Sequence, residues 1–233
     1  MNRYVTKGIV LSRIDYGESD RIITFITPER GKLRAMAKGV RKPKSKIAGG
    51  IELFSISDLT ILQGKGEINT LMSARLDTHF GHIVKDTART HAAYEAIKAI
   101  NKATEEEPEE AYFNLLAQTY ESLNDSKLNP DVTAAWFAIR LLHLAGHTPD
   151  LSSDLNGDKL AQADNYDFHL DAMRFTPSPS GHGAFTVNDI KFLRLGSRAA
   201  SAEALQQITD APSLAADLHP LLQSMLKTSL GLK

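Results

Sequence analysis

The sequence predicts an α+β protein with a small five-stranded β-barrel over residues 1–77 and an α-helical domain over residues 78–233. The first observation behind this is a change near residue 78, where the spacing of apolar residues passes from period 2, typical of strands, to period 3.6, typical of helices. The second is a division of charge. Residues 1–50 carry 12 Lys and Arg against 4 Asp and Glu, whereas the other 183 residues carry 15 basic and 24 acidic groups. The net charge of −1 is therefore the sum of +8 in residues 1–50 and −9 in residues 51–233. This division of charge indicates a polyanionic partner for the N-terminal part of the chain.

Five short segments within residues 1–77, called the head below, favour strands because they are rich in β-branched and aromatic residues or alternate between apolar and polar residues. They are Tyr4–Arg13, Arg21–Thr27, Lys32–Lys38, Ile51–Leu62 and Glu67–Ala74. Turn residues separate them, for example Pro and Gly in the segment 28–31. Five antiparallel strands in about 75 residues fit a Greek-key barrel of the OB type, with a small sandwich as the alternative.

Residues 78–233, called the body below, contain five segments with helical periodicity. The expected helices cover His79–Thr104, a segment that opens at Pro108, Asn129–Gly146, Asn188–Arg198 and Leu214–Leu230. The apolar stripe of the second consists of Tyr112, Leu115, Leu116, Thr119 and Leu123. Residues 147–185 are polar and contain three prolines and little periodicity, so we expect an irregular insertion there.

Composition excludes several classes of protein. The chain has no Cys, which excludes disulfides, thiol catalysis and thiolate metal sites. Its longest apolar run has six residues, Ala134–Ile139, and its first residues lack the apolar core of a secretory signal, so we expect a cytoplasmic protein without a membrane partner. P-loop, HExxH, GxSxG and GxGxxG motifs are absent, and we expect neither enzymatic activity nor a cofactor.

The positive charge of the head is concentrated in residues 30–46, where eight of seventeen residues are basic and none is acidic. These are the first candidate DNA-binding residues: Arg30, Lys32, Arg34, Lys38, Arg41, Lys42, Lys44 and Lys46. Lys32, Arg34 and Lys38 fall on one strand face, and the last four on the loop that follows. A basic strand face beside a basic loop is how OB folds follow a phosphate backbone, and each neutralised phosphate releases a condensed cation. A merely solvated face and an anionic membrane surface are the alternatives; no accompanying amphipathic helix supports the membrane.

Aromatic residues are sparse in the head. Tyr16, in a polar connection beside Gly17, is the best candidate for stacking on a base, and packing at a strand end is its alternative. With so few rings, we expect sequence-tolerant binding through the backbone that accepts single or double strands.

Several short motifs then resemble the N-terminal domain of the RecO family of DNA repair proteins. In order along the chain they are Thr6–Leu11, Tyr16–Ile22, Gly31–Leu33, Ala37–Lys42 and Ser45, and weaker matches follow at Arg140–Leu142, Gly146 and Pro149–Leu151. The resemblance implies an N-terminal OB domain and a helical C-terminal domain. It also implies a recombination mediator, associated with the bacterial nucleoid, that binds single- and double-stranded DNA and anneals complementary strands. Such a mediator acts with RecR, and often RecF, to load recombinase onto strands coated by single-strand binding protein. Arg21, within the second motif, joins the DNA-binding candidates.

The chain departs from the RecO pattern in one respect. Many members carry two Cys pairs for zinc after a Pro-x-Leu element, but here Asp154 and Gly157 stand roughly where the first pair would fall. His169 and His182 with Asp154 or Asp171 match no compact metal motif, so we expect no metal.

A basic stripe in the body is the candidate for a protein partner. Lys191, Arg194 and Arg198 lie at i, i+3 and i+7 beside apolar residues, and Arg140 is added to them. Such a stripe suits an acidic peptide with a hydrophobic end, and the resemblance implies that the C-terminal tail of single-strand binding protein docks on this domain. A solvated helix face is the alternative.

We therefore expect a non-enzymatic mediator whose barrel binds and anneals DNA and whose helical body recruits proteins. A generic OB adaptor that binds RNA or the acidic surface of another protein, without annealing activity, is the alternative function.

Overall fold

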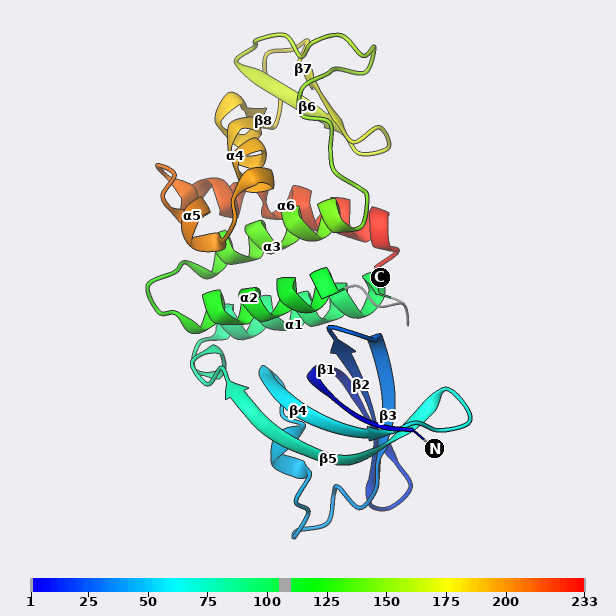
Figure 1. Cartoon of the computed structure of the whole chain (residues 1–233). Helices are drawn as coiled ribbons and strands as arrows, with labels where there is room; N and C mark the ends of the chain where they lie inside the picture. The colour runs from blue at the N-terminus through cyan, green and yellow to red at the C-terminus, as the bar shows by residue number, and fades with distance from the viewer. Residues whose placement is uncertain (1, 105–109, 233) are drawn as a thin grey trace. The chain divides into compact units, whose positions relative to one another are not determined.

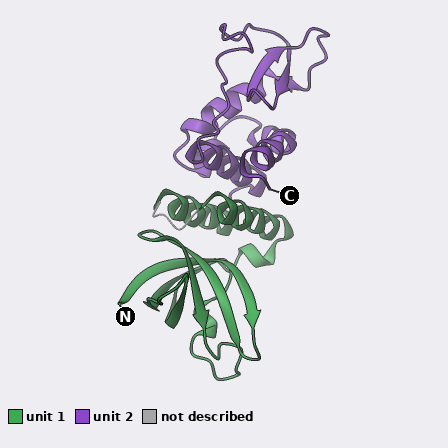
Figure 2. Ribbon diagram, turned by 90° about the vertical axis from the view of Figure 1, so that its right-hand side faces the viewer, with its two compact units in different colours: residues 1–125 green, residues 126–233 purple. Residues whose placement is uncertain are grey.

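The computed structural model describes residues 2–104 and 110–232, and they fall into two compact units, residues 1–125 and 126–233 (Figures 1 and 2). The first unit contains the barrel and two helices. The predicted fold class is confirmed, because a closed five-stranded barrel is followed by a helical region. The expected domain boundary after residue 77 stays a prediction.

The barrel strands are β1 (Arg3–Tyr16), β2 (Asp20–Thr27), β3 (Gly31–Ala37), β4 (Ser55–Leu62) and β5 (Ile68–His79). They close in the order β1-β2-β3-β5-β4. The expectation that all pairs are antiparallel is wrong for one pair: β3 and β5 run parallel, with Arg34 opposite Ile68 and Met36 opposite Thr70. The tight turn after β4 makes β5 antiparallel to β4, and closing the ring then sets its first residues alongside β3 in the same direction.

Burial follows the alternation that the sequence predicted for β3. Leu33, Ala35 and Ala37 are buried in the barrel, and the residues between them are half-buried on the outer face. The interior is mainly apolar and is centred on Ile23, Phe25 and other strand residues that expose almost no surface, and it also contains a few buried polar residues such as Thr27. The outer face of the same strands is therefore free to carry polar and functional groups.

The first helix, α1 (Thr87–Ala103), begins eight residues later than expected. His79 still belongs to β5, and a 3-10 turn, η2 (Ile83–Lys85), precedes the helix. The start is set by Asp86, whose side chain accepts a hydrogen bond from the N–H of Arg89 at 2.9 Å. The apolar periodicity of the sequence extended across this boundary because Phe80 and Ile83 are buried although neither belongs to an α-helix.

The second helix, α2 (Glu110–Asn124), lies beside α1 over one end of the barrel (Figure 1). Its expected opening at Pro108 lies outside the described residues, but its predicted apolar stripe is confirmed as buried. The two helices are joined by Arg89, whose Nη1 donates to the carbonyl oxygens of Leu123 and Asp125, each at 2.8 Å. Tyr120 of α2 is fully buried against Phe54 and Phe80, with ring centroids 5.8 and 5.6 Å away.

Residues 126–232 form four α-helices, which are α3 (Pro130–Leu144), α4 (Val187–Arg198), α5 (Ala202–Gln206) and α6 (Ala211–Leu230). Three agree with the predicted helices, and the short α5 was not expected. The third helix was expected to start at Asn129, and this residue caps α3, because its side chain accepts from the N–H of Asp131 at 2.8 Å. The core of this unit includes Trp136, whose Nε1 donates to the carbonyl of Ala199 at 3.1 Å.

The expectation that residues 147–185 are irregular is wrong in part. They contain the strands β6 (Asn165–His169) and β7 (Arg174–Pro177), and β8 (Phe185–Thr186) completes a sheet in the order β7-β6-β8. Phe175 is fully buried in this sheet, with the ring of Phe168 4.7 Å from its own. Strands of two to five residues are too short to show period 2 in the sequence, which is why they escaped prediction.

Candidate nucleic-acid interface

Two connections of the barrel meet at one end of it, the β1–β2 turn (residues 17–19) and the β3–β4 connection (residues 38–54). The N–H of Arg41 donates to the carbonyl of Ser19 at 2.9 Å, and the N–H of Gly39 donates to Oδ1 of Asp20 at 2.7 Å. Gly39 has φ of +63°, a conformation that favours glycine and turns the chain away from β3. A short 3-10 helix, η1 (Ala48–Gly50), packs the far side of the connection onto β5. The basic loop is therefore anchored at both ends.

Four lysines of this loop carry unneutralised charge. Lys38, Lys42, Lys44 and Lys46 are exposed, and none of them forms an ion pair with a residue in the described part of the chain. Like charges so close together raise the local potential and attract anions. This loop is the part of the predicted DNA-binding set that the fold leaves most accessible.

The two arginines at this end share one carboxylate. Nε of Arg21 lies 2.7 Å from Oδ1 of Asp15, and Nη1 of Arg41 lies 3.5 Å from Oδ2 of the same side chain. The hydrogen bond from Arg21, followed by the charge of Arg41, lowers the pKa of Asp15 below its usual value, so the carboxylate stays ionised. Sequence reasoning missed Asp15, because it lies in a polar connection with Glu18 and Asp20, and only the fold brings Arg41 to it.

An apolar row lies on the outer face of the sheet beside the loop. Ile14, Ile22 and Met36 are opposite one another across β1, β2 and β3, and they alternate with the buried Ile23 and Ala35. Ile14 exposes 57% of its surface, which is unusual for isoleucine in a barrel. Sequence reasoning missed this row, because only the pairing of the strands places the three residues together.

Tyr16 extends the outer face toward the β1–β2 turn. It lies two residues from Ile14 on the same strand and therefore on the same side, and it exposes 56% of its surface. Its ring makes none of the ring contacts found among the described residues, so the prediction that it is available for stacking is compatible with its position.

The first residues of the basic stretch lie elsewhere and have partners. The guanidinium carbon of Arg30 is 3.8 Å from the centroid of the Tyr4 ring, and Nζ of Lys32 donates to the carbonyl of Asn101 in the last turn of α1 at 2.9 Å. Arg34, in the middle of β3, is 3.9 Å from the exposed carboxylate of Glu67. Because β3 spans about 20 Å from Gly31 to Ala37, the eight basic residues do not form one compact cluster.

The predicted peptide-binding residues of the second unit differ in whether their side chains are hydrogen-bonded to the main chain. Nε of Arg194 donates to the carbonyl of Leu151 at 3.1 Å, and Nη1 of Arg140 donates to that of Ser197 at 3.2 Å. Lys191 is exposed on α4. Of these four residues, Arg198 lines the cavity found at the end of α4.

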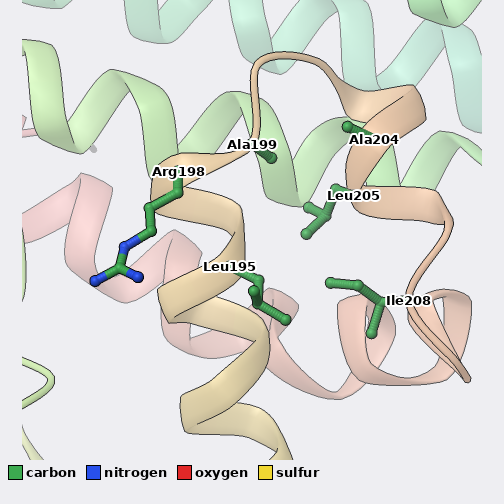
Figure 3. Close-up of a pocket in the computed structure, with 6 residues that line it drawn as sticks. All are labelled: Leu195, Arg198, Ala199, Ala204, Leu205 and Ile208. Atoms are coloured by element: carbon green, nitrogen blue, oxygen red, sulfur yellow. The ribbon is translucent and has the colours of Figure 1, made fainter.

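That cavity has a volume of about 250 Å³ and lies between the end of α4 and α5. It is lined by Leu195, Arg198, Ala199, Ala204, Leu205 and Ile208. Figure 3 shows the side chains of Leu195, Leu205 and Ile208 pointing toward one another, while that of Arg198 extends away from them. The cavity is apolar, with one cation at its edge.

Comparison with known proteins agrees with this architecture. The family model described as "Recombination protein O N terminal" matches residues 1–80, and the model described as "Recombination protein O C terminal" matches residues 85–233. The chain belongs to the recombination protein O (RecO) family. The two RecO models meet where β5 ends, between the barrel and α1.

Three curated relatives carry the name DNA repair protein RecO. The protein of Desulfatibacillum aliphaticivorans is 36% identical over 149 residues, which are 63% of this chain and 58% of the relative. That of Dehalococcoides mccartyi strain CBDB1 is 34% identical over 161 residues, 69% of this chain and 63% of the relative. That of Bifidobacterium longum subsp. infantis is 33% identical over 211 residues, 81% of this chain and 87% of the relative. The chain thus aligns with less than two thirds of the length of the first two.

The loop where RecO resemblance placed a zinc-binding Cys pair is held by hydrogen bonds. Oδ1 of Asp154 accepts from the N–H of Asn156 at 2.8 Å and from that of Asp158 at 3.1 Å, and the N–H of Gly157 donates to the carbonyl of Asp154 at 3.1 Å. Among residues 2–104 and 110–232, no three His, Asp or Glu side chains gather closely enough to hold a metal ion. The residues present do not fit zinc, because the chain has no thiolate and this carboxylate is already engaged.

No helix within the described residues is long and apolar enough to span a membrane.

Proposed function

We propose that this RecO-family chain binds DNA at the end of the barrel that carries the basic loop, and that it mediates repair and recombination without being an enzyme. The observation that supports this most is a group of four exposed lysines that form no ion pair with any described residue, on the loop next to the exposed Tyr16 and Ile14. Membership of the family supports the same role. The alternative, an adaptor for RNA or an acidic protein surface, is not favoured by any further observation.

The chemistry of this end of the barrel suits annealing. Two complementary strands repel each other through their phosphates, and mobile ammonium groups on one loop reduce this repulsion for any base sequence. The outer face offers Tyr16 and an aliphatic row, on which bases rest through dispersion and burial without base-specific hydrogen bonds. No step of pairing needs a nucleophile or a metal, so the protein contributes charge and position alone.

Protein partners complete the proposed role. We propose that the chain works with RecR, and in some pathways with RecF, to load recombinase onto strands coated by single-strand binding protein, in the bacterial cytoplasm where the nucleoid lies. The acidic C-terminal tail of single-strand binding protein is proposed to dock at the α4–α5 cavity. Leu195, Leu205 and Ile208 would receive its hydrophobic end, and Arg198, after a rotation of its side chain, would bind its carboxylate.

Strand annealing tests the proposal directly. Complementary oligonucleotides are coated with single-strand binding protein from the same organism, and pairing is followed by fluorescence energy transfer with and without the chain. The mediator role predicts faster pairing, whereas the adaptor role predicts none. If pairing of coated strands is not accelerated, the mediator function is wrong, and binding of RNA of matched sequence and length then tests the adaptor.

A further inference from the structure

The carboxylate of Asp15 lies between two arginines at the end of the barrel that carries the basic loop. Asp15 is the last residue but one of β1 and is surrounded by Arg13, Arg21 and Arg41, all of which lower its pKa. A carboxylate here repels phosphate, and its presence in a surface proposed to bind DNA needs a physical reason.

The geometry around Asp15 is that of a bound anion. The guanidinium of Arg21 comes from β2 and that of Arg41 from the β3–β4 connection, and each faces a different oxygen of the carboxylate, at 2.7 and 3.5 Å. The two arginine side chains are 32% and 38% exposed, and that of Asp15 is 53% exposed, so another anion can approach. Guanidinium pairs of this kind bind the oxygens of carboxylate and phosphate alike.

The loop does not depend on Asp15 for its shape. Its backbone is tied to the β1–β2 turn through Ser19 and through the neighbouring carboxylate of Asp20, which accepts from the N–H of Gly39. Removal of the charge at Asp15 therefore releases the two guanidinium groups while the main chain that carries them remains anchored. This separation makes the role of Asp15 testable.

We propose that Asp15 occupies a phosphate-binding site, where it holds Arg21 and Arg41 in position until a backbone phosphate of nucleic acid displaces it. The proposal rests on the proposed DNA binding and deepens it. Because the arginines are already placed, little side-chain entropy is lost when phosphate arrives. Because phosphate must compete with Asp15, the strand is held loosely, which suits a protein that has to release the annealed duplex.

The test compares Asp15→Asn with Asp77→Asn in the full chain. Both variants remove one negative charge, but Asp77 lies on β5 and pairs with Lys7, which also has Asp58 at 3.4 Å. Lys7 and Asp15 are eight residues apart on β1, about 26 Å along the strand. Affinity for a fluorescent deoxythymidine oligonucleotide is measured at NaCl concentrations from about 50 to about 300 mM, a range in which counterion release changes the affinity strongly.

Asp15→Asn is expected to bind the oligonucleotide several-fold more tightly than Asp77→Asn at low salt. Its plot of log K against log salt should have about the slope of the wild type, because the same phosphate contact forms in both proteins and only the competing carboxylate is removed. If Asp15→Asn binds no more tightly than Asp77→Asn, or more weakly than the wild type, Asp15 supports the arginines without competing with phosphate, and the proposal is overturned.

A second measurement separates this proposal from the proposed function. Inorganic pyrophosphate is titrated into the wild type, and the Nε–Hε signal of Arg21 and the carboxyl signal of Asp15 are followed by NMR. Displacement predicts a shift of the Arg21 signal and a rise in the pKa of Asp15 toward its usual value. If neither signal moves, no phosphate site exists there even if DNA binds. If both move but the wild type fails to bind the oligonucleotide, the phosphate site stands and the DNA-binding function is wrong.

Discussion

Replacement of four lysines together by glutamine tests the electrostatic core of the proposed function. Lys38, Lys42, Lys44 and Lys46 are exposed and lack ion-pair partners among the described residues, so their removal should leave the fold intact. Arg41, Lys32 and Arg34 are left unchanged, because each already has a partner within the barrel unit. The substitution thus removes only the charge that the fold leaves available.

The expected magnitude follows from counterion release. Each lysine that neutralises one phosphate of a single strand contributes about 0.7 to the slope of log K against log salt, so loss of four contacts should flatten it by up to about 2.8. Between 50 and 200 mM salt, a slope of about 2.8 corresponds to roughly a 50-fold change in affinity. The variant should therefore bind weakly at low salt and lose little more as salt rises.

Fluorescence anisotropy with a deoxythymidine oligonucleotide, repeated at five or more salt concentrations, gives this slope. The matched control replaces four exposed lysines that lie away from the loop, namely Lys85, Lys102, Lys159 and Lys227. It removes the same net charge and should leave the slope unchanged. Should the loop variant retain the wild-type slope, or the control lose as much, the loop lysines do not contact phosphates and the reasoning fails.

Four further predictions concern single residues. Tyr16→Ala should weaken binding of a single strand by about 5- to 150-fold without changing the salt slope, because base stacking is lost and no charge is removed; anisotropy measures both. Gly50→Ala should unfold at lower urea concentration, since its Cβ would overlap the main-chain oxygen of Ala74 in β5, whereas Gly49→Ala meets open space and should be neutral. Tyr120→Phe should be as stable as the wild type or more stable by about 1–3 kcal/mol in urea unfolding, because its buried hydroxyl has no partner among the described residues. Hydrogen bonding, chiefly from the N–H of Ser152, lowers the pKa of Asp150 from 3.8 to about 2. The stability it contributes is present above its unfolded pKa and is lost as pH falls through the folded one, so Asp150→Asn should lose less stability between pH 4 and pH 2 than the wild type in acid titrations followed by circular dichroism.

The barrel was largely predictable because the signals for its strands, alternation and turn residues, lie between neighbouring residues of the sequence. Alternation in Lys32–Lys38 identified which side chains of β3 are buried, and the turn residues placed the ends of β2 and β3 to within one residue. The predicted bounds were wrong elsewhere, because β1 and β5 extend to Tyr16 and His79 and β4 begins only at Ser55. The helices were predicted by the same logic, with one error of start. Phe80 and Ile83 continue the apolar spacing of α1 backwards, but they are buried outside any α-helix, so period alone could not locate the cap at Asp86.

The candidate site was predictable in part. The basic loop could be read from composition, because eight cations in seventeen residues are visible in any conformation. The sequence could not predict which of these cations remain available to bind phosphate. Lys32 donates a hydrogen bond to a carbonyl 69 residues away, and Arg30 lies on the ring of Tyr4. These contacts depend on elements that come together only when the barrel closes and α1 packs.

The sequence by itself determined the fold class, the division of charge and the loop that carries the charge, because period, turn chemistry and local charge density are properties of neighbouring residues. The tertiary structure alone decided the rest. Strand pairing set Ile14, Ile22 and Met36 in one row, and chain closure brought Arg21 and Arg41 to a single carboxylate. The physical reason is that non-local contacts depend on register and closure, and neither is encoded in any short stretch of residues.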